Sequence, residues 1–87
     1  VCDAISGLID EVNSGTLNRK TKEPFLATLK AACASFDRAQ CKAGSNQLNA
    51  FINKVRAQLG RTNPAEAARL IAEAKAILDC VDCPAEE

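Results

Sequence analysis

The fold is indicated most clearly by residues 46–60, which read NQLNAFINKVRAQLG. Apolar side chains recur in this stretch at steps of three and four residues, at Leu48, Phe51, Ile52, Val55 and Leu59. This spacing is the period of an α-helix with one buried face, whereas a half-buried strand would alternate apolar and polar residues. We therefore expect a long amphipathic helix, and Gly60 stands where a left-handed residue would terminate it.

The same period predicts three further helices. The first runs from about Cys2 to Val12. The second is expected to begin at Thr21, a good N-cap residue, so that Pro24 falls in the first turn, where its missing amide hydrogen costs little. Asp37 is expected to cap the third helix, which contains residues 46–60.

The fourth helix has the clearest beginning in the chain. Asn63 is a preferred N-cap, Pro64 suits the first helical position, and Glu66 follows the cap by three residues, as in a capping box. Pro84 is expected to end this helix. Short connections favour antiparallel neighbours, so the sequence predicts an all-α fold, a compact up-and-down bundle of four helices.

The predicted bundle forms a single domain over residues 1–83, followed by an acidic C-terminal tail at 84–87. An 87-residue chain buries a modest share of its surface, so covalent cross-links would add to its stability. The apolar stripes predict a core that contains Leu29, Phe36, Phe51, Ile52, Val55, Leu70, Ile71 and Ile77.

The composition argues against several classes of function. The chain has 11 basic and 11 acidic residues and no histidine. Neutral net charge favours neither nucleic acid nor an anionic membrane, and no apolar run reaches the roughly 20 residues that span a bilayer. Without histidine there is no nucleophile–histidine pair, and the glycines are too scattered for a phosphate-binding loop. We predict no catalytic residues, no metal site and no cofactor, and hence a protein that is not an enzyme.

A basic patch surrounds the start of the second predicted helix. It lacks the tyrosine and tryptophan side chains that stack on bases, so we expect an ordinary solvated surface. Its members are Arg19, Lys20, Lys22 and Lys30.

All five cysteines fall at one end of the predicted bundle. Cys2, Cys33, Cys41 and Cys80 lie on or beside the apolar stripes, and two disulfides among them would cross-link that end. Four cysteines allow three pairings. We favour Cys33 with Cys41 across the second turn and Cys2 with Cys80 between the chain ends. Cys83 is then the odd cysteine, which suggests an intermolecular bond, a mixed disulfide or a variant pairing with Cys80. The disulfides predict a secreted or cell-surface protein.

Cys80 and Cys83 also match the Cys-x-x-Cys spacing of redox and zinc sites. A thiol redox or zinc protein that uses these two residues is therefore an alternative. Redox sites place the first thiol at a helix N-terminus, whereas Cys80 is predicted at a helix C-terminus. Zinc would need four thiolates to converge, since histidine is absent.

The stretch NQLNAFINKVRAQLG resembles the core of the FIMAH domain family, small helical modules of secreted and cell-surface bacterial proteins. The resemblance covers roughly residues 5–80. It implies a cysteine just ahead of the Asn-Gln-Leu run and another at the end of the last helix. Here that first position is Ser45 and the nearest upstream cysteine is Cys41, so the resemblance implies Cys41 with Cys80 as a rival pairing. It implies no catalytic role, but an accessory, attachment or interaction module outside the cytoplasm.

Asn46, Asn49 and Asn53 recur at three and four residues, opposite the apolar stripe of their helix. Uncharged amides in a row can hydrogen-bond a glycan, a protein or another copy of the chain. We therefore expect a non-catalytic extracellular structural or adhesive module, whose partner is an unknown protein, a glycan or a copy of itself. The alternative is a self-assembling subunit of a disulfide-linked dimer or extracellular filament, joined through Cys83 or through the amide face.

Overall fold

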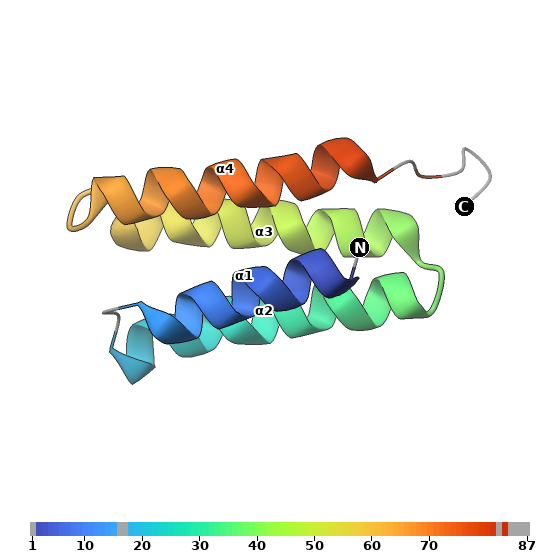
Figure 1. Ribbon diagram of the computed structural model, residues 1–87, viewed down its shortest axis with the longest axis horizontal. Helices are drawn as coiled ribbons and strands as arrows, with labels where there is room; N and C mark the ends of the chain where they lie inside the picture. The colour runs from blue at the N-terminus through green and yellow to red at the C-terminus, as the bar shows by residue number, and fades with distance from the viewer. Residues whose placement is uncertain (1, 16–17, 82, 84–87) are drawn as a thin grey trace.

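The computed structural model describes residues 2–15, 18–81 and 83. Four helices make up this part of the chain: α1 (Cys2–Ser14), α2 (Arg19–Asp37), α3 (Cys41–Leu59) and α4 (Pro64–Cys80). They run alternately up and down, and each packs against its neighbours in chain order, with α4 returning beside α1 (Figure 1). The predicted all-α bundle of four helices is thus confirmed. The predicted acidic tail at 84–87 and the expected stop at Pro84 lie outside the described residues.

The beginning of α4 agrees with the sequence prediction. Asn63 is its N-cap, the Asn63 side chain accepts a hydrogen bond from the Glu66 amide at 3.4 Å, and Pro64 occupies the first turn. The helix ends at Cys80, and Val81 follows in an extended conformation. Local capping chemistry is therefore enough to fix where this helix begins.

The predicted beginning of α2 is wrong by a few residues. Asn18, not Thr21, is the N-cap, and its side chain accepts the Thr21 amide at 2.9 Å. Both residue types cap helices, and the earlier cap wins because it adds a further turn. Pro24 consequently lies inside the helix, where its carbonyl accepts a hydrogen bond from the Thr28 hydroxyl at 2.8 Å.

The turn between α2 and α3 also differs from the prediction. Asp37 is the last residue of α2 and does not cap α3, which begins at Cys41 after an N-cap, Gln40, that makes no side-chain capping bond. The Gln40 amide donates to the Ser35 carbonyl at 2.8 Å, and Ala39 has a φ of 60°. This is a Schellman ending in which alanine stands in the left-handed position that glycine usually takes.

Gly60 does not take the left-handed conformation expected of it. Its φ and ψ are −58° and −30°, in the right-handed helical region, and its amide bonds to the Arg56 carbonyl. The chain therefore continues as a helical turn through Gly60 until Asn63 begins α4.

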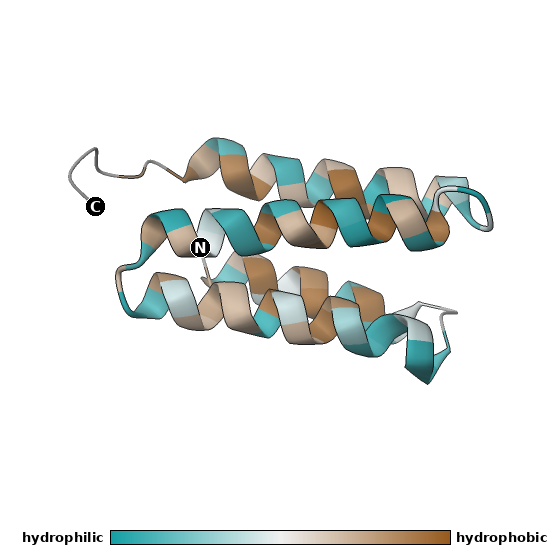
Figure 2. Ribbon diagram, turned by 180° about the vertical axis from the view of Figure 1, so that it is seen from behind, coloured by the Kyte–Doolittle hydropathy of each residue, from teal (hydrophilic) through white to brown (hydrophobic). Residues whose placement is uncertain are grey.

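The core lies along the bundle axis, where all four helices contribute buried side chains. Of the predicted core residues, Phe36 and Ile71 are only partly buried, and the other six are buried. Phe25 and Phe51 meet edge to face at the centre, with ring centroids 5.8 Å apart. Brown apolar segments line the inner sides of the ribbons in Figure 2, as an amphipathic bundle requires.

The bundle is packed unevenly. The α2–α3 pair packs most extensively, and the α1–α4 pair packs least. On the tight side, Phe36 of α2 lies directly over Gly44 of α3, so close that an added Cβ would lie 2.7 Å from the ring. The looser side, between α1 and α4, leaves a groove on the surface. Among the described residues, no helix is long and apolar enough to cross a membrane.

Candidate functional site

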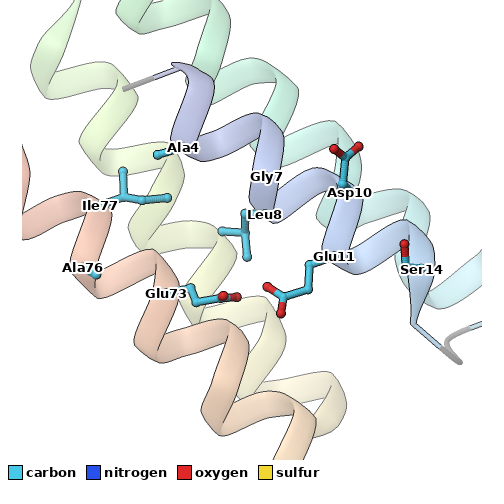
Figure 3. A pocket seen from close by; sticks show the side chains of 9 residues that line it. All are labelled: Ala4, Gly7, Leu8, Asp10, Glu11, Ser14, Glu73, Ala76 and Ile77. Atoms are coloured by element: carbon cyan, nitrogen blue, oxygen red, sulfur yellow. The ribbon is translucent and has the colours of Figure 1, made fainter.

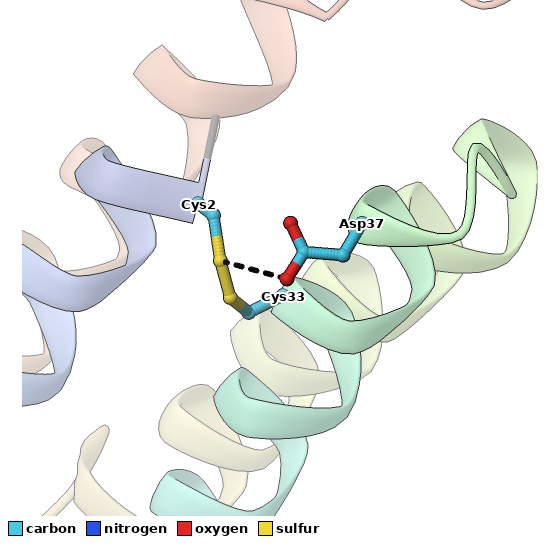
Figure 4. Close-up of a disulfide and its surroundings, with 3 residues drawn as sticks. All are labelled: Cys2, Cys33 and Asp37. Atoms are coloured by element: carbon cyan, nitrogen blue, oxygen red, sulfur yellow. Dashed lines mark hydrogen bonds between the residues drawn. A yellow bond between two sulfur atoms is a disulfide. The ribbon is translucent and has the colours of Figure 1, made fainter.

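Two disulfides cross-link one end of the bundle. Cys2 at the start of α1 is bonded to Cys33 on α2, with Cα atoms 4.9 Å apart (Figure 4). Cys41 at the start of α3 is bonded to Cys83, beyond the end of α4, with Cα atoms 5.4 Å apart. The structure therefore contains the predicted pair of disulfides at one end, each joining two helices or their extensions that pack side by side.

The individual pairings and the odd cysteine were predicted wrongly. Neither Cys33–Cys41 and Cys2–Cys80 nor the rival Cys41–Cys80 is formed. Cys33 and Cys41 are close in sequence, but each bonds to a different neighbour, α1 and the α4 extension. Cys80 is the free cysteine, and it is exposed.

Helix geometry explains why Cys80 and Cys83 exchange the roles predicted for them. Cys80 lines a hollow with Ala4 and Ile77, so it lies on the side of α4 that faces α1. Cys83 lies three residues further on, past the end of α4, where the chain returns to α3. Its Sγ is 3.6 Å from Ser45 Oγ. Because Cys83 is bonded to Cys41, the Cys-x-x-Cys pair of Cys80 and Cys83 is not available as a dithiol in this structure.

One group of side chains has the proximity of metal ligands. The sulfur atoms of Cys2 and Cys33 and a carboxylate oxygen of Asp37 all lie within 4.8 Å of one another. Figure 4 shows the Asp37 carboxylate turned toward the disulfide, 3.9 Å from Cys2 Sγ. Metals bind thiolates, and a disulfide offers none, so this group is a cross-link with a carboxylate beside it.

A groove lies between α1 and α4, which we call the α1/α4 groove (Figure 3). It encloses about 530 Å³. A neighbouring hollow of about 460 Å³ shares Ala4, Ala76 and Ile77 with it and extends to Cys80. Small side chains on both helices leave this space open. The groove is lined by Ala4, Gly7, Leu8, Asp10, Glu11, Ser14, Glu73, Ala76 and Ile77.

Two carboxyl groups face each other across the α1/α4 groove. Figure 3 shows Glu11 of α1 and Glu73 of α4 pointing toward one another. A hydrogen bond with Glu11, then burial, then the charge of Glu11 raise the pKa of Glu73, and Arg69 opposes the shift. Arg69 Nε lies 3.4 Å from Glu11, and Arg69 also pairs with Glu66 at 2.9 Å. The groove thus combines an apolar floor with an acidic rim.

Sequence reasoning missed this groove. The partner of Glu11 is Glu73, which lies on another helix and far away in the sequence. A usable signal was present: Ala4, Gly7 and Ala76 are small residues, and both carboxylates flank apolar stripes. Only the three-dimensional pairing of α1 with α4 brings these signals together.

A second hollow, of about 340 Å³, lies between α2 and α3. Exposed Pro24 contributes apolar surface above the buried ring of Phe25, and Lys20 and Lys54 contribute charge. Lys54 Nζ donates to Thr28 Oγ1 at 2.7 Å. The threonine is a neutral acceptor, so this bond positions the ammonium group without neutralising it. Lys20, expected to belong to a merely solvated patch, is part of a hollow that has both apolar and basic surface.

The amide face lies where it was expected. Asn46, Asn49 and Asn53 are all exposed along one side of α3. Their predicted role in binding stays a prediction. Comparisons of the chain with protein-family models, with curated proteins and with solved structures find no match.

Proposed function

We propose that this chain is a non-catalytic structural or interaction module that works outside the cytoplasm. The observation that supports this most is the pair of disulfides at one end of the bundle. Disulfides form and persist in oxidising compartments and are rare in reducing ones. In a chain of 87 residues they would add stability that a small core cannot supply alone.

The α1/α4 groove supports the interaction part of the proposal. Its floor is apolar, formed by the largely buried Leu8 and Ile77 beside exposed Ala4 and Ala76, and its rim is acidic where Glu11 and Glu73 lie. An apolar strip bordered by polar groups is the general form of a protein-contact surface. We therefore propose the groove, rather than the amide face of α3, as the main contact surface.

The FIMAH-like resemblance belongs to this proposal. The family places a cysteine at the position of Ser45, and here Ser45 Oγ lies 3.6 Å from Cys83 Sγ. The cross-link between α3 and the end of α4 is made one turn earlier, by Cys41. A bacterial accessory or attachment module fits this arrangement.

A self-assembling subunit is the second candidate function, and the exposed free thiol favours it. In the predicted form of this alternative the joining residue was Cys83, but Cys83 is engaged with Cys41. Cys80 is free and exposed, so an intermolecular disulfide would form through Cys80 instead. A dimer that runs at twice the mass on a non-reducing gel, and that Cys80→Ser abolishes, would support this candidate.

The test of the main proposal is a thiol count on native protein, followed by reduction. After free thiols are blocked, we expect an intact mass with one blocked cysteine, and peptide mapping should place it at Cys80. Reduction should lower the free energy of unfolding by about 2 to 4 kcal/mol for each disulfide, because each closes a long loop. Five blocked thiols on a folded protein of unchanged stability would contradict the proposal.

A further inference from the structure

The two opposite faces of the bundle carry opposite charge. Because α1 packs with α2 and α4, and α3 packs with the same two helices, the α1/α4 face and the α2/α3 face lie on opposite sides (Figure 1). On α1 and α4 there are six acidic and two basic side chains. On α2 and α3 there are seven basic and two acidic ones. The two helices that form one face are therefore net negative by four charges in total, and the two that form the other are net positive by five.

Each face also has a hollow whose charge matches its helices. The α1/α4 groove has Asp10, Glu11 and Glu73 at its rim. The α2/α3 hollow has Lys20 and Lys54. Arg69, the basic side chain nearest the acidic groove, is already engaged by two glutamates, so it does not offset Glu73 fully.

We propose that copies of this chain associate face to back, with the acidic α1/α4 groove of one copy seated on the basic α2/α3 face of the next. Each contact joins an apolar strip with an acidic rim to a partly apolar surface that carries lysines. This complementarity disfavours a symmetric contact between two α1/α4 faces or between two α2/α3 faces, since either would bring like charges together. The inference rests on the proposed function, since it names the partner of the interaction module.

The dimensions are adequate for such a contact. The molecule measures 40 × 18 × 17 Å, so its long sides extend over an area of the same order as the roughly 800 Å² that each partner buries in a specific interface. The formal net charge is zero, so repulsion between whole copies does not oppose association. Because the two faces lie on opposite sides of the molecule, a pair of copies still has one free acidic face and one free basic face. Further copies can bind to either, and the product is an open chain.

Sedimentation velocity on the whole disulfide-bonded protein tests the proposal. At low ionic strength we expect sizes that grow with concentration beyond a dimer. Raising the salt should shrink them, because the Debye length falls from about 30 Å at 0.01 M to about 8 Å at 0.15 M. Oligomers that persist in salt but disappear in Cys80→Ser would be disulfide-linked and would overturn the proposal.

Neutral, near-isosteric variants test the direction of the contact. The acidic-face variant is Asp10→Asn with Glu73→Gln, and the basic-face variant is Lys20→Gln with Lys54→Gln. Each alone should associate at least about ten-fold more weakly than the wild type. An equimolar mixture should form a pair that does not extend, because each variant retains the one face that the other lacks.

Arg38→Gln with Arg61→Gln is the matched control. It removes two positive charges, as the basic-face variant does, but from the turns at the ends of the bundle. This control should associate as the wild type does. Circular dichroism melting confirms that each variant is folded.

Three outcomes would overturn the inference. These are a wild type that is monomeric at low salt, a mixture of variants that fails to pair, and a control that weakens association as much as the basic-face variant. A monomer with one free thiol and both disulfides would still leave the proposed extracytoplasmic module intact. The failure of this inference is thus distinguishable from the failure of the function it rests on.

Discussion

The two sides of this bundle are built on the same helical period but are filled differently. Between α2 and α3, aromatic rings occupy the space: Phe25 meets Phe51 edge to face, and Phe36 lies against Gly44. Between α1 and α4, alanine, glycine and a pair of facing carboxyl groups leave a groove. The size of the side chains between two helices, rather than the helical pattern itself, therefore decides how extensively a pair of helices packs.

The largest expected loss of stability comes from removing an aromatic ring between α2 and α3. Phe51→Ala removes a fully buried ring that packs on Phe25, and we expect it to lower the free energy of unfolding by about 3 to 5 kcal/mol. Leu8→Ala is the matched change on the loose side. Leu8 is 3% exposed and lines the groove, so its loss should cost about 2 to 3 kcal/mol, because less enclosed cavity is created.

Urea unfolding of the two variants beside the wild type measures both losses. The free energies are compared at equal m-value, since a change in m would signal an altered unfolded state. A Leu8→Ala loss equal to or larger than that of Phe51→Ala would contradict the division into a tight and a loose side.

The next effect comes from adding one methyl group on each side. Gly44→Ala places a Cβ 2.7 Å from the Phe36 ring, and we expect a net loss of about 1 to 2 kcal/mol despite the better helix propensity of alanine. The Cβ added by Gly7→Ala has no atom within 4 Å. The higher helix propensity of alanine should therefore stabilise the protein by up to about 1 kcal/mol. Thermal melting gives the sign of both changes, and two changes of the same sign would argue against the close contact at Gly44.

The helices could be predicted from sequence because their causes are local. Apolar spacing predicts α3, and the cap residues Asn63 and Pro64 fix the beginning of α4. Errors arose where two residues competed for one role. Asn18 and Thr21 are both good caps, and Asp37 is a preferred cap residue but ends α2, because the chain turns through a Schellman ending at Ala39.

The disulfide pairing and the groove could not be predicted in this way. All five cysteines were correctly expected at one end, but which thiols meet depends on the side of each helix that they occupy. Cys80 and Cys83 are three residues apart, and α4 ends between them. Cys80 therefore lies on the side of α4 that faces α1, whereas Cys83 reaches α3. Likewise, Glu11 and Glu73 are far apart in sequence and become a pair only when α1 lies beside α4.

The smallest expected effect tests the pair of carboxyl groups in the α1/α4 groove. The hydrogen bond with Glu11 raises the pKa of Glu73 above its ordinary value of 4.5. The folded chain therefore holds the Glu73 proton more tightly than the unfolded chain does. This contribution to stability is fully present below about pH 4.5 and is lost as pH rises through the folded pKa.

Glu73→Gln keeps a neutral hydrogen-bonding group at all pH values. The variant should therefore not lose stability from this site as pH rises. Its stability relative to wild type should therefore increase as pH rises from the acid side of 4.5 toward neutrality, and then level off. Glu11→Gln should weaken the same dependence, because it takes away the carboxyl group that contributes most to the raised pKa of Glu73 and leaves burial as the only cause that raises it. Because Glu73 is exposed, solvent screens the interaction and the effect is small. A difference in urea midpoint between wild type and Glu73→Gln that stays constant across this range would show that the two carboxyl groups do not interact across the groove.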